Sequence, residues 1–174
     1  ALQIDPELAE AHAALGDSLS IYAWNWEEAD KEFSRAIELN PRVDYSHLAR
    51  ATSFLSAMGR TDEMVAEASR ALDLEPLSMI NNSILVTAYL YARQNENALR
   101  QGLKALELGP EFLIARHWLG IAYIANGKYD DAITVAEGGL KLSPQHPEML
   151  FVIGRAKAQK GDRRGAEDVI RQLQ

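Results

Sequence analysis

The sequence predicts an all-α protein, a right-handed α-solenoid of about five stacked helix–turn–helix units. Five of the six prolines, at positions 6, 41, 76, 110 and 144, recur at intervals of 35, 35, 34 and 34 residues, and a similar apolar segment precedes each. Proline stops a helix because it lacks the N–H group and clashes with the preceding turn. Breaks that contain Gly or Asn divide these intervals, and no period-two alternation long enough for a sheet is present.

The prolines divide a single predicted domain, residues 1–174, into repeats. Residues 1–8 are interpreted as the tail of a preceding repeat. The repeats themselves cover residues 9–43, 44–78, 79–112, 113–146 and 147–174, the last of them truncated. The chain begins without Met and lacks the basic and apolar regions of a signal peptide, so we interpret it as a segment of a larger multi-domain protein.

Short turns between the two helices of a repeat are predicted at 57–60, 93–95, 125–128 and 159–162, because Gly and Asn there suit a left-handed helix C-cap. The first repeat contains one extra residue, and the segment 22–27, with Trp24 and Trp26, replaces a short turn. We favour the interpretation that these tryptophans staple a widened turn, since Trp is usually mostly buried. The alternative is an exposed recognition edge.

Small residues are predicted where helix backbones approach one another. They are Gly16, Ala29, Ala98, Gly120, Ala132, Gly154 and Ala166. Larger residues, namely Leu15, Tyr89, Leu119 and Tyr123, are expected to fill the space between repeats. Gly102, Gly138 and Gly139 lie inside second helices, where each costs about 1 kcal/mol relative to Ala. Close helix contact is the expected compensation.

In the fourth repeat Leu119-Gly120 is followed by Tyr123, Ala132 and Pro144, and in the first repeat Leu15-Gly16 is followed by Ala29, Phe33 and Pro41. This pattern resembles the tetratricopeptide repeat (TPR) family. The resemblance extends over essentially the whole chain. It implies a protein-interaction module that binds a peptide or partner protein in a concave groove lined by the first helix of each repeat.

The residues expected in this groove lie on the first helices opposite the Leu-Gly pair. They are Asp17, Arg50, Ser53, Ile84, Thr87, Tyr91, His117, Ile121, Ile124, Phe151 and Arg155. The alternative for Ile84, Ile121 and Phe151 is packing between neighbouring first helices. Some family members hold a C-terminal carboxylate with Lys and Asn at these places. Here Ala13, Ala49, Asp17 and Ser53 stand instead, so we do not predict binding of such a tail.

Composition disfavours several other functions. The net charge of −7 and the pI of about 5.1 make a nucleic-acid partner a poor fit, since phosphate binding needs clustered Lys and Arg. The absence of Cys excludes disulfides and thiolate zinc sites, and no apolar stretch approaches the ~20 residues that span a bilayer. We predict no metal, no cofactor and no membrane insertion. The compartment is unknown, with the cytoplasm favoured.

Catalytic motifs are also missing. The four histidines, His12, His47, His117 and His146, show no His-Glu-x-x-His spacing, and His12 is interpreted as a packed structural residue. The acidic pairs Glu27-Glu28 and Asp130-Asp131 begin second helices, where negative charge favours the helix dipole. We therefore predict that the protein is not an enzyme.

A second hypothesis is structural self-assembly, in which copies stack head-to-tail into a filament. Neither end carries a dedicated polar capping helix, and the two ends are almost in register. The expected end-to-end contact residues are Ala1, Leu2, Val169, Ile170 and Leu173. The alternative is that both ends are cut points within a longer array.

Overall fold

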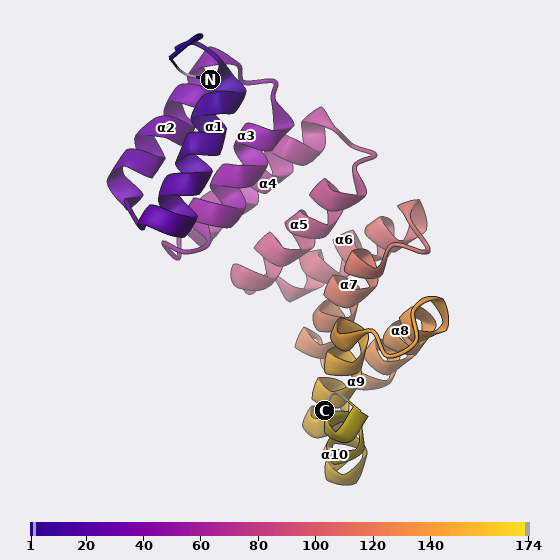
Figure 1. Cartoon of the computed structure of the whole chain (residues 1–174). Coiled ribbons are helices and arrows are strands. Elements are labelled where there is room, and N and C mark those ends of the chain that lie inside the picture. The colour runs from indigo at the N-terminus through magenta and orange to yellow at the C-terminus, as the bar shows by residue number, and fades with distance from the viewer. Residues whose placement is uncertain (2, 173–174) are drawn as a thin grey trace. The chain divides into compact units, whose positions relative to one another are not determined.

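A computed structural model describes residue 1 and residues 3–172, and the regular secondary structure within them is helical throughout. The chain divides into two compact units, residues 1–92 and 93–174, each made of helices that pack on their neighbours in the sequence (Figure 1). The division falls between helices α5 (Met79–Tyr91) and α6 (Asn95–Leu108). This architecture confirms the predicted all-α class of stacked helix pairs.

The first unit contains two complete helix pairs and one further first helix. Helix α1 (Ala9–Ser18) continues into the π-helical turn η1 (Leu19–Ala23) and packs on α2 (Trp26–Leu39). Helix α3 (Asp44–Ala49) continues into the π-helical turn η2 (Arg50–Leu55) and packs on α4 (Thr61–Leu74), which contacts α5. The core of this unit includes Phe33, Phe54, Leu55, Met64 and Leu85.

The second unit repeats the arrangement without π-helical turns. Helix α6 packs on α7 (Leu113–Ala125), which packs on α8 (Tyr129–Leu142) and contacts α9 (Pro147–Lys160). Helix α9 packs on α8 and on α10 (Arg163–Gln172). Its core includes Ile124, Met149, Val152, Ile153 and Val169.

The π-helical turns explain why the first two intervals are one residue longer than the next two. A π-turn accommodates one extra residue within a helix through an i→i+5 hydrogen bond. The amide of Ser56 donates such a bond to the carbonyl of Ala51 over 3.1 Å. The extra residue of the first repeat was expected in the turn around Trp24. The structure instead places π-helical turns at the ends of both first helices, in η1 and in η2.

Left-handed residues end the first helices at the predicted breaks. Gly59, Gly127 and Gly161 have φ values of 67°, 72° and 91°, as expected for glycine caps. The expectation for asparagine was wrong, because Arg93 takes the left-handed conformation in its turn, with φ of 56°. Asn95 and Asn126 instead link two turns. The side-chain amide of Asn95 donates to the Ala125 carbonyl, and that of Asn126 donates to the Asn95 carbonyl.

Small residues permit close helix packing as predicted. A Cβ at Gly120 would lie 2.6 Å from Val152 Cγ1, and one at Gly102 would lie 3.0 Å from Leu119 Cδ1. Glycine at these positions therefore offsets its cost in a helix by allowing the contact. Gly138 differs, because it faces the guanidinium of Arg116. Leu15, which was expected between repeats, is 36% exposed.

Candidate protein-binding surfaces

A repeated polar contact positions the loop in front of each of four first helices. The residue six positions after the loop proline donates a side-chain hydrogen bond to that proline's carbonyl. The pairs are His12 with Pro6 at 2.9 Å, His47 with Pro41 at 3.1 Å, Asn82 with Pro76 at 3.0 Å and Arg116 with Pro110 at 2.6 Å. The donor at this position is His in two repeats, Asn in the third and Arg in the fourth, so the sequence pattern alone did not reveal the contact.

Two of these donors are histidines that also face a carboxylate. His12 Nδ1 lies 2.6 Å from Glu32 Oε2, and His47 Nδ1 lies 2.5 Å from Glu67 Oε2. Burial lowers the pKa of His47, but the hydrogen bonds to Glu67 and to the Pro41 carbonyl outweigh it, so the pKa is raised. Because a backbone carbonyl can only accept, this geometry favours an imidazolium with both nitrogens donating. His12 is packed and bonded in the same way, which supports its structural interpretation.

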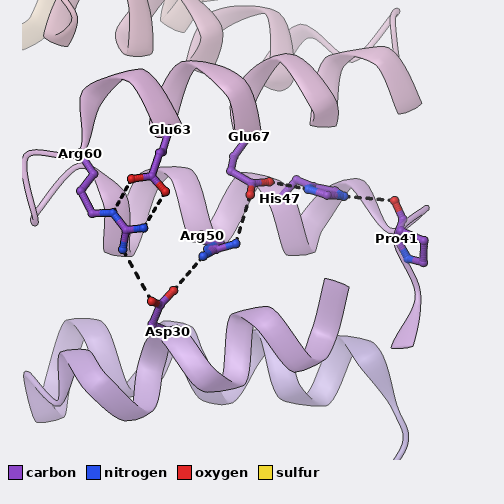
Figure 2. A network of polar contacts seen from close by, with 7 residues as sticks. All are labelled: Asp30, Pro41, His47, Arg50, Arg60, Glu63 and Glu67. Carbon is purple, nitrogen blue, oxygen red and sulfur yellow. Dashed lines mark hydrogen bonds and ion pairs between the residues drawn. The ribbon is translucent and has the colours of Figure 1, made fainter. Parts of the chain in front are cut away.

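The His47–Glu67 pair belongs to a network that joins first and second helices (Figure 2). The guanidinium of Arg50 donates to Glu67 over 3.2 Å and to Asp30 over 2.8 Å. Arg60 also pairs with Asp30, at 3.6 Å. Arg50, which was expected in the partner-binding groove, is partly exposed and forms ion pairs with carboxylates of α2 and α4. It begins η2, whose wider turn departs from α-helical spacing.

The first unit exposes a first-helix surface of mixed polar and aromatic character, which we define by Asp17, Tyr45, Ser53, Ile84 and Tyr91. The hydroxyl of Ser53 donates to Asp17 Oδ1, so η2 and α1 meet there. Burial and the charge of Asp17 raise the pKa of Tyr45, whose ring is partly exposed. Ile84 packs against the core, while the Tyr91 side chain is largely exposed.

Thr87 does not belong to this surface. It is buried, and its hydroxyl donates to the Ser83 carbonyl of the same helix over 3.2 Å. The prediction that it lines the groove was therefore wrong. A 3.6-residue pattern cannot separate the outward stripe of a first helix from the adjacent buried stripe when both contain small or apolar residues.

The second unit exposes an aromatic and apolar first-helix surface, defined by Ile114, His117, Ile121, Phe151 and Arg155. The rings of His117 and Phe151 stack with centroids 6.3 Å apart and an interplanar angle of 29°. Phe151 remains 48% exposed, and Ile114 and Arg155 are exposed as well. Burial lowers the pKa of His117, partly opposed by the charge of Glu148, so its neutral ring is favoured against Phe151.

Two differences from the expected residues concern α7. Ile124 is buried in the core of the second unit, so its assignment to the groove was wrong. Ile121 is partly buried and packs against that core, which supports the alternative packing role. Ile114 was missed, although its spacing of three residues before His117 places both on one helix face.

The expected end-to-end residues behave differently from one another. Val169 was expected as an end-to-end contact residue, but it is buried against Gly154 in the second unit and is not free for such a contact. Ile170 and Ala1 are exposed. Leu2 and Leu173 lie outside the described residues. The bond from Asp5 N to Ala1 O corresponds to the bond from Asn40 N to Ala36 O at the end of α2.

The two tryptophans of the first repeat have separate environments. Trp26 is partly buried against the core, as a staple requires. Trp24 is 73% exposed, has a left-handed backbone with φ of 53°, and donates its indole N–H to the Ile21 carbonyl over 3.2 Å. Trp26 therefore fits the interpretation of a packed residue that staples the turn. Trp24 fits the alternative of an exposed edge.

The described residues contain little that resembles a chemical site. No cluster of three or more His, Asp or Glu side chains within residue 1 and residues 3–172 is arranged to hold a metal ion. In the same part of the chain no helix is long and apolar enough to cross a membrane. Glu27-Glu28 and Asp130-Asp131 occupy the first turns of α2 and α8, in agreement with the helix-dipole interpretation.

Comparison with known proteins identifies the family. The family model described as "Tetratricopeptide repeat" matches residues 85–147 and 119–174, which together cover more than half of the chain. The chain therefore belongs to the tetratricopeptide repeat family. A comparison with curated protein sequences finds no match.

Several solved structures are similar to this chain. MamA from Desulfovibrio magneticus RS-1 is 16% identical, with a TM-score of 0.75 over 95% of this chain and 92% of that one. The TPR protein TTC0263 from Thermus thermophilus is 18% identical, with a TM-score of 0.75 over 92% and 87%. YrrB, described as a TPR protein with an unusual peptide-binding site, is 19% identical, with a TM-score of 0.69 over 98% and 87%. At these identities the similarity shows the fold alone.

Proposed function

We propose that this protein is a protein-interaction scaffold that binds a peptide or partner protein on its first-helix surfaces, as a segment of a larger multi-domain protein. Family membership supports the scaffold role, and the peptide-binding site described for YrrB is consistent with it. The scaffold is proposed to consist of the five repeats that begin at residues 9, 44, 79, 113 and 147. No catalytic role is proposed.

The observation that carries this proposal is the exposed aromatic surface of the second unit. Phe151 stacks on His117, yet about half of its side chain faces solvent beside the exposed Ile114. An aromatic ring held in place by a neighbouring ring loses little conformational entropy when a partner covers it. Arg155, one helical turn beyond Phe151, adds a charge at the edge of this surface. The surface therefore fits an extended or helical segment with an apolar anchor and a nearby carboxylate.

The test selects peptides that bind the wild-type chain from a displayed random library and measures their affinity for variants of the chain. Phe151→Ala is expected to weaken the selected peptides by about tenfold or more, because it removes the central anchor. Leu142→Ala is the matched control, since Leu142 is 46% exposed but lies at the end of a second helix. Tyr91→Ala probes the first unit in the same way. Circular dichroism should show unchanged helix content in all three variants. Unaltered binding by both Phe151→Ala and Tyr91→Ala would place the site elsewhere.

Self-association is the second candidate, and the charge distribution favours it. Residues 1–92 carry 15 acidic and 6 basic side chains, whereas residues 93–174 carry 10 acidic and 12 basic ones. With neutral His the formal charges are −9 and +2, so the first unit of one copy attracts the second unit of another. The exposed Ile170 adds apolar area on α10.

Light scattering across a wide concentration range distinguishes the two candidates. Head-to-tail stacking predicts a mass that climbs without a plateau and falls back when salt is added. A constant mass near 19.3 kDa at low salt would contradict self-association. It would leave the peptide-binding scaffold as the proposed function.

A further inference from the structure

A cleft of about 480 Å³ opens in the first unit, between the turn that joins η1 to α2 and the residues of η2 and its C-terminal end. Trp24, Trp26 and Ile21 line one side, and Ser53, Ser56 and Ala57 line the other. The two indole rings lie 6.5 Å apart at an angle of 42°, so the wall they form is aromatic and not flat. All of these residues belong to the first unit.

Trp24 is held in place although most of its side chain is exposed. Its backbone has a left-handed conformation, which is costly for a bulky residue, and its indole N–H donates to the Ile21 carbonyl. The corresponding turns at the ends of three other first helices use Gly59, Gly127 and Gly161 at a left-handed position. A large aromatic residue therefore stands where glycine would fold more easily, which is typical of a position used for binding.

The charge beside the cleft is negative, and it forms no ion pair with the residues that the structure describes. Ser53, which lines the cleft, donates its hydroxyl to the carboxylate of Asp17. Within the described residues no Lys or Arg nitrogen forms an ion pair with this carboxylate, whereas Arg50 and Arg60 are occupied by carboxylates of their own. The surrounding unit carries an excess of nine negative charges. A cation entering the cleft would thus meet aromatic faces and an available carboxylate.

We propose that this cleft binds an arginine side chain of a partner peptide, with the guanidinium stacked on the Trp24 and Trp26 rings and its charge balanced by Asp17. A planar guanidinium suits this site better than an ammonium, because it stacks on aromatic faces and is more weakly hydrated. The proposal deepens the proposed protein-binding function, since it specifies what the first unit recognises. The site is separate from the Phe151 surface of the second unit.

The test uses N-acetyl-arginine amide as the probe and N-acetyl-citrulline amide as its neutral counterpart of the same shape. Each is titrated into the ¹⁵N-labelled wild-type chain while the indole N–H signals of Trp24 and Trp26 are followed. The arginine probe is expected to shift both signals saturably, with an affinity about fivefold or more above that of the citrulline probe. Equal responses to the two probes would overturn the proposal, because they would show an apolar cleft without charge selectivity.

Two variants locate the contact. Trp24→Gly introduces the residue that three corresponding turns already use, so the fold should persist while arginine binding falls by about fivefold or more. Asp17→Asn keeps an oxygen acceptor for Ser53 and removes only the charge, so a severalfold loss confined to the arginine probe is expected. Tyr22→Ala is the control, because Tyr22 is 84% exposed next to this turn but does not line the cleft.

The outcomes separate this proposal from the broader one. Phe151→Ala should leave arginine binding unchanged, whether or not it weakens the selected peptides. Retention of full arginine binding in Trp24→Gly, or in Asp17→Asn, would overturn the arginine site while leaving the Phe151 surface intact. Loss of peptide binding in Phe151→Ala together with a saturable arginine response at Trp24 would support both.

Discussion

At the scale of single residues, two kinds of position set the stability of this chain. Glycines such as Gly120 allow backbones to approach until there is no space for a Cβ, and interior packing is dense enough that added atoms are not absorbed easily. Histidines such as His47 connect a carboxylate to a loop carbonyl. The glycines could be predicted from the Leu-Gly pattern. The histidine contacts could not, because the carboxylate lies 20 residues away and the residue type that bonds the loop carbonyl changes from repeat to repeat.

Gly120→Ala is expected to destabilise the fold by about 1–3 kcal/mol, because the new Cβ would lie 2.6 Å from Val152 Cγ1. Urea unfolding followed by circular dichroism measures the change. Val152→Ala should relieve much of this clash, so the cost of Gly120→Ala should shrink in that background. Equal costs in both backgrounds would contradict the packing explanation.

The His47 pair predicts a stability that depends on pH. The pKa of His47 in the folded chain is raised above 6.5, so its contribution is fully present below pH 6.5 and is lost as pH rises through the folded value. Glu67 favours the protonated ring, whereas burial and Arg70 oppose it. His47→Asn keeps a donor for the Pro41 carbonyl, as Asn82 does for Pro76.

The melting temperature of the wild-type chain should fall between about pH 6 and pH 9, and it should fall by less in His47→Asn. His12 forms the same type of pair, with a pKa that is also raised, so part of the decrease should remain. An unchanged pH profile in His47→Asn would show that the pair does not stabilise the fold. Differential scanning calorimetry in buffers of constant ionic strength makes the comparison.

At the scale of elements, periodicity predicted the helices well and their outward faces less well. Proline and glycine fix where helices stop, because their backbone restrictions act locally. The 35-residue interval indicated an extra residue but not its place, and the structure absorbs it in the π-helical turns η1 and η2. Thr87 and Ile124 were expected on the outward face but are buried, since the neighbouring helices decide which stripe of a first helix stays exposed.

The turns between helices offer a prediction in which one substitution has opposite effects at two positions. Arg93→Gly should stabilise the fold by about 1 kcal/mol, because Arg93 is left-handed, with φ of 56°, where glycine is unstrained. Arg100→Gly, in the interior of α6, should instead destabilise it by about 1 kcal/mol. Thermal unfolding of the two variants checks the sign. Destabilisation by both would show that the Arg93 side chain makes a contribution larger than its backbone strain.

At the scale of the whole molecule, the two units differ in charge and in the direction in which the pKa values of His12, His47 and His117 are shifted. A solenoid places each repeat in contact with its neighbours only, so local stability can vary along the chain. The raised pKa values of His12 and His47 lie in the first unit, whereas the lowered pKa of His117 lies in the second. A lowered histidine pKa means that stability is lost as pH falls below 6.5.

Raising the pH from about 6 to about 8 should therefore loosen the first unit and tighten the second. Hydrogen exchange read by mass spectrometry, corrected for the intrinsic pH dependence of exchange, measures the stability change of each unit separately. Peptides from α1 to α4 should lose protection, and those from α7 to α9 should keep or gain it. A uniform change along the chain would contradict this separation.

The contact between each loop proline and the side chain six residues later has a consequence for how such an array diversifies. His12, His47, Asn82 and Arg116 make the same kind of bond through side chains of different chemistry. A duplicated repeat could therefore exchange one donor for another and keep its loop closed. Each exchange would alter the local charge and the response to acid, which lets a lineage adjust the conditions under which each copy is most stable.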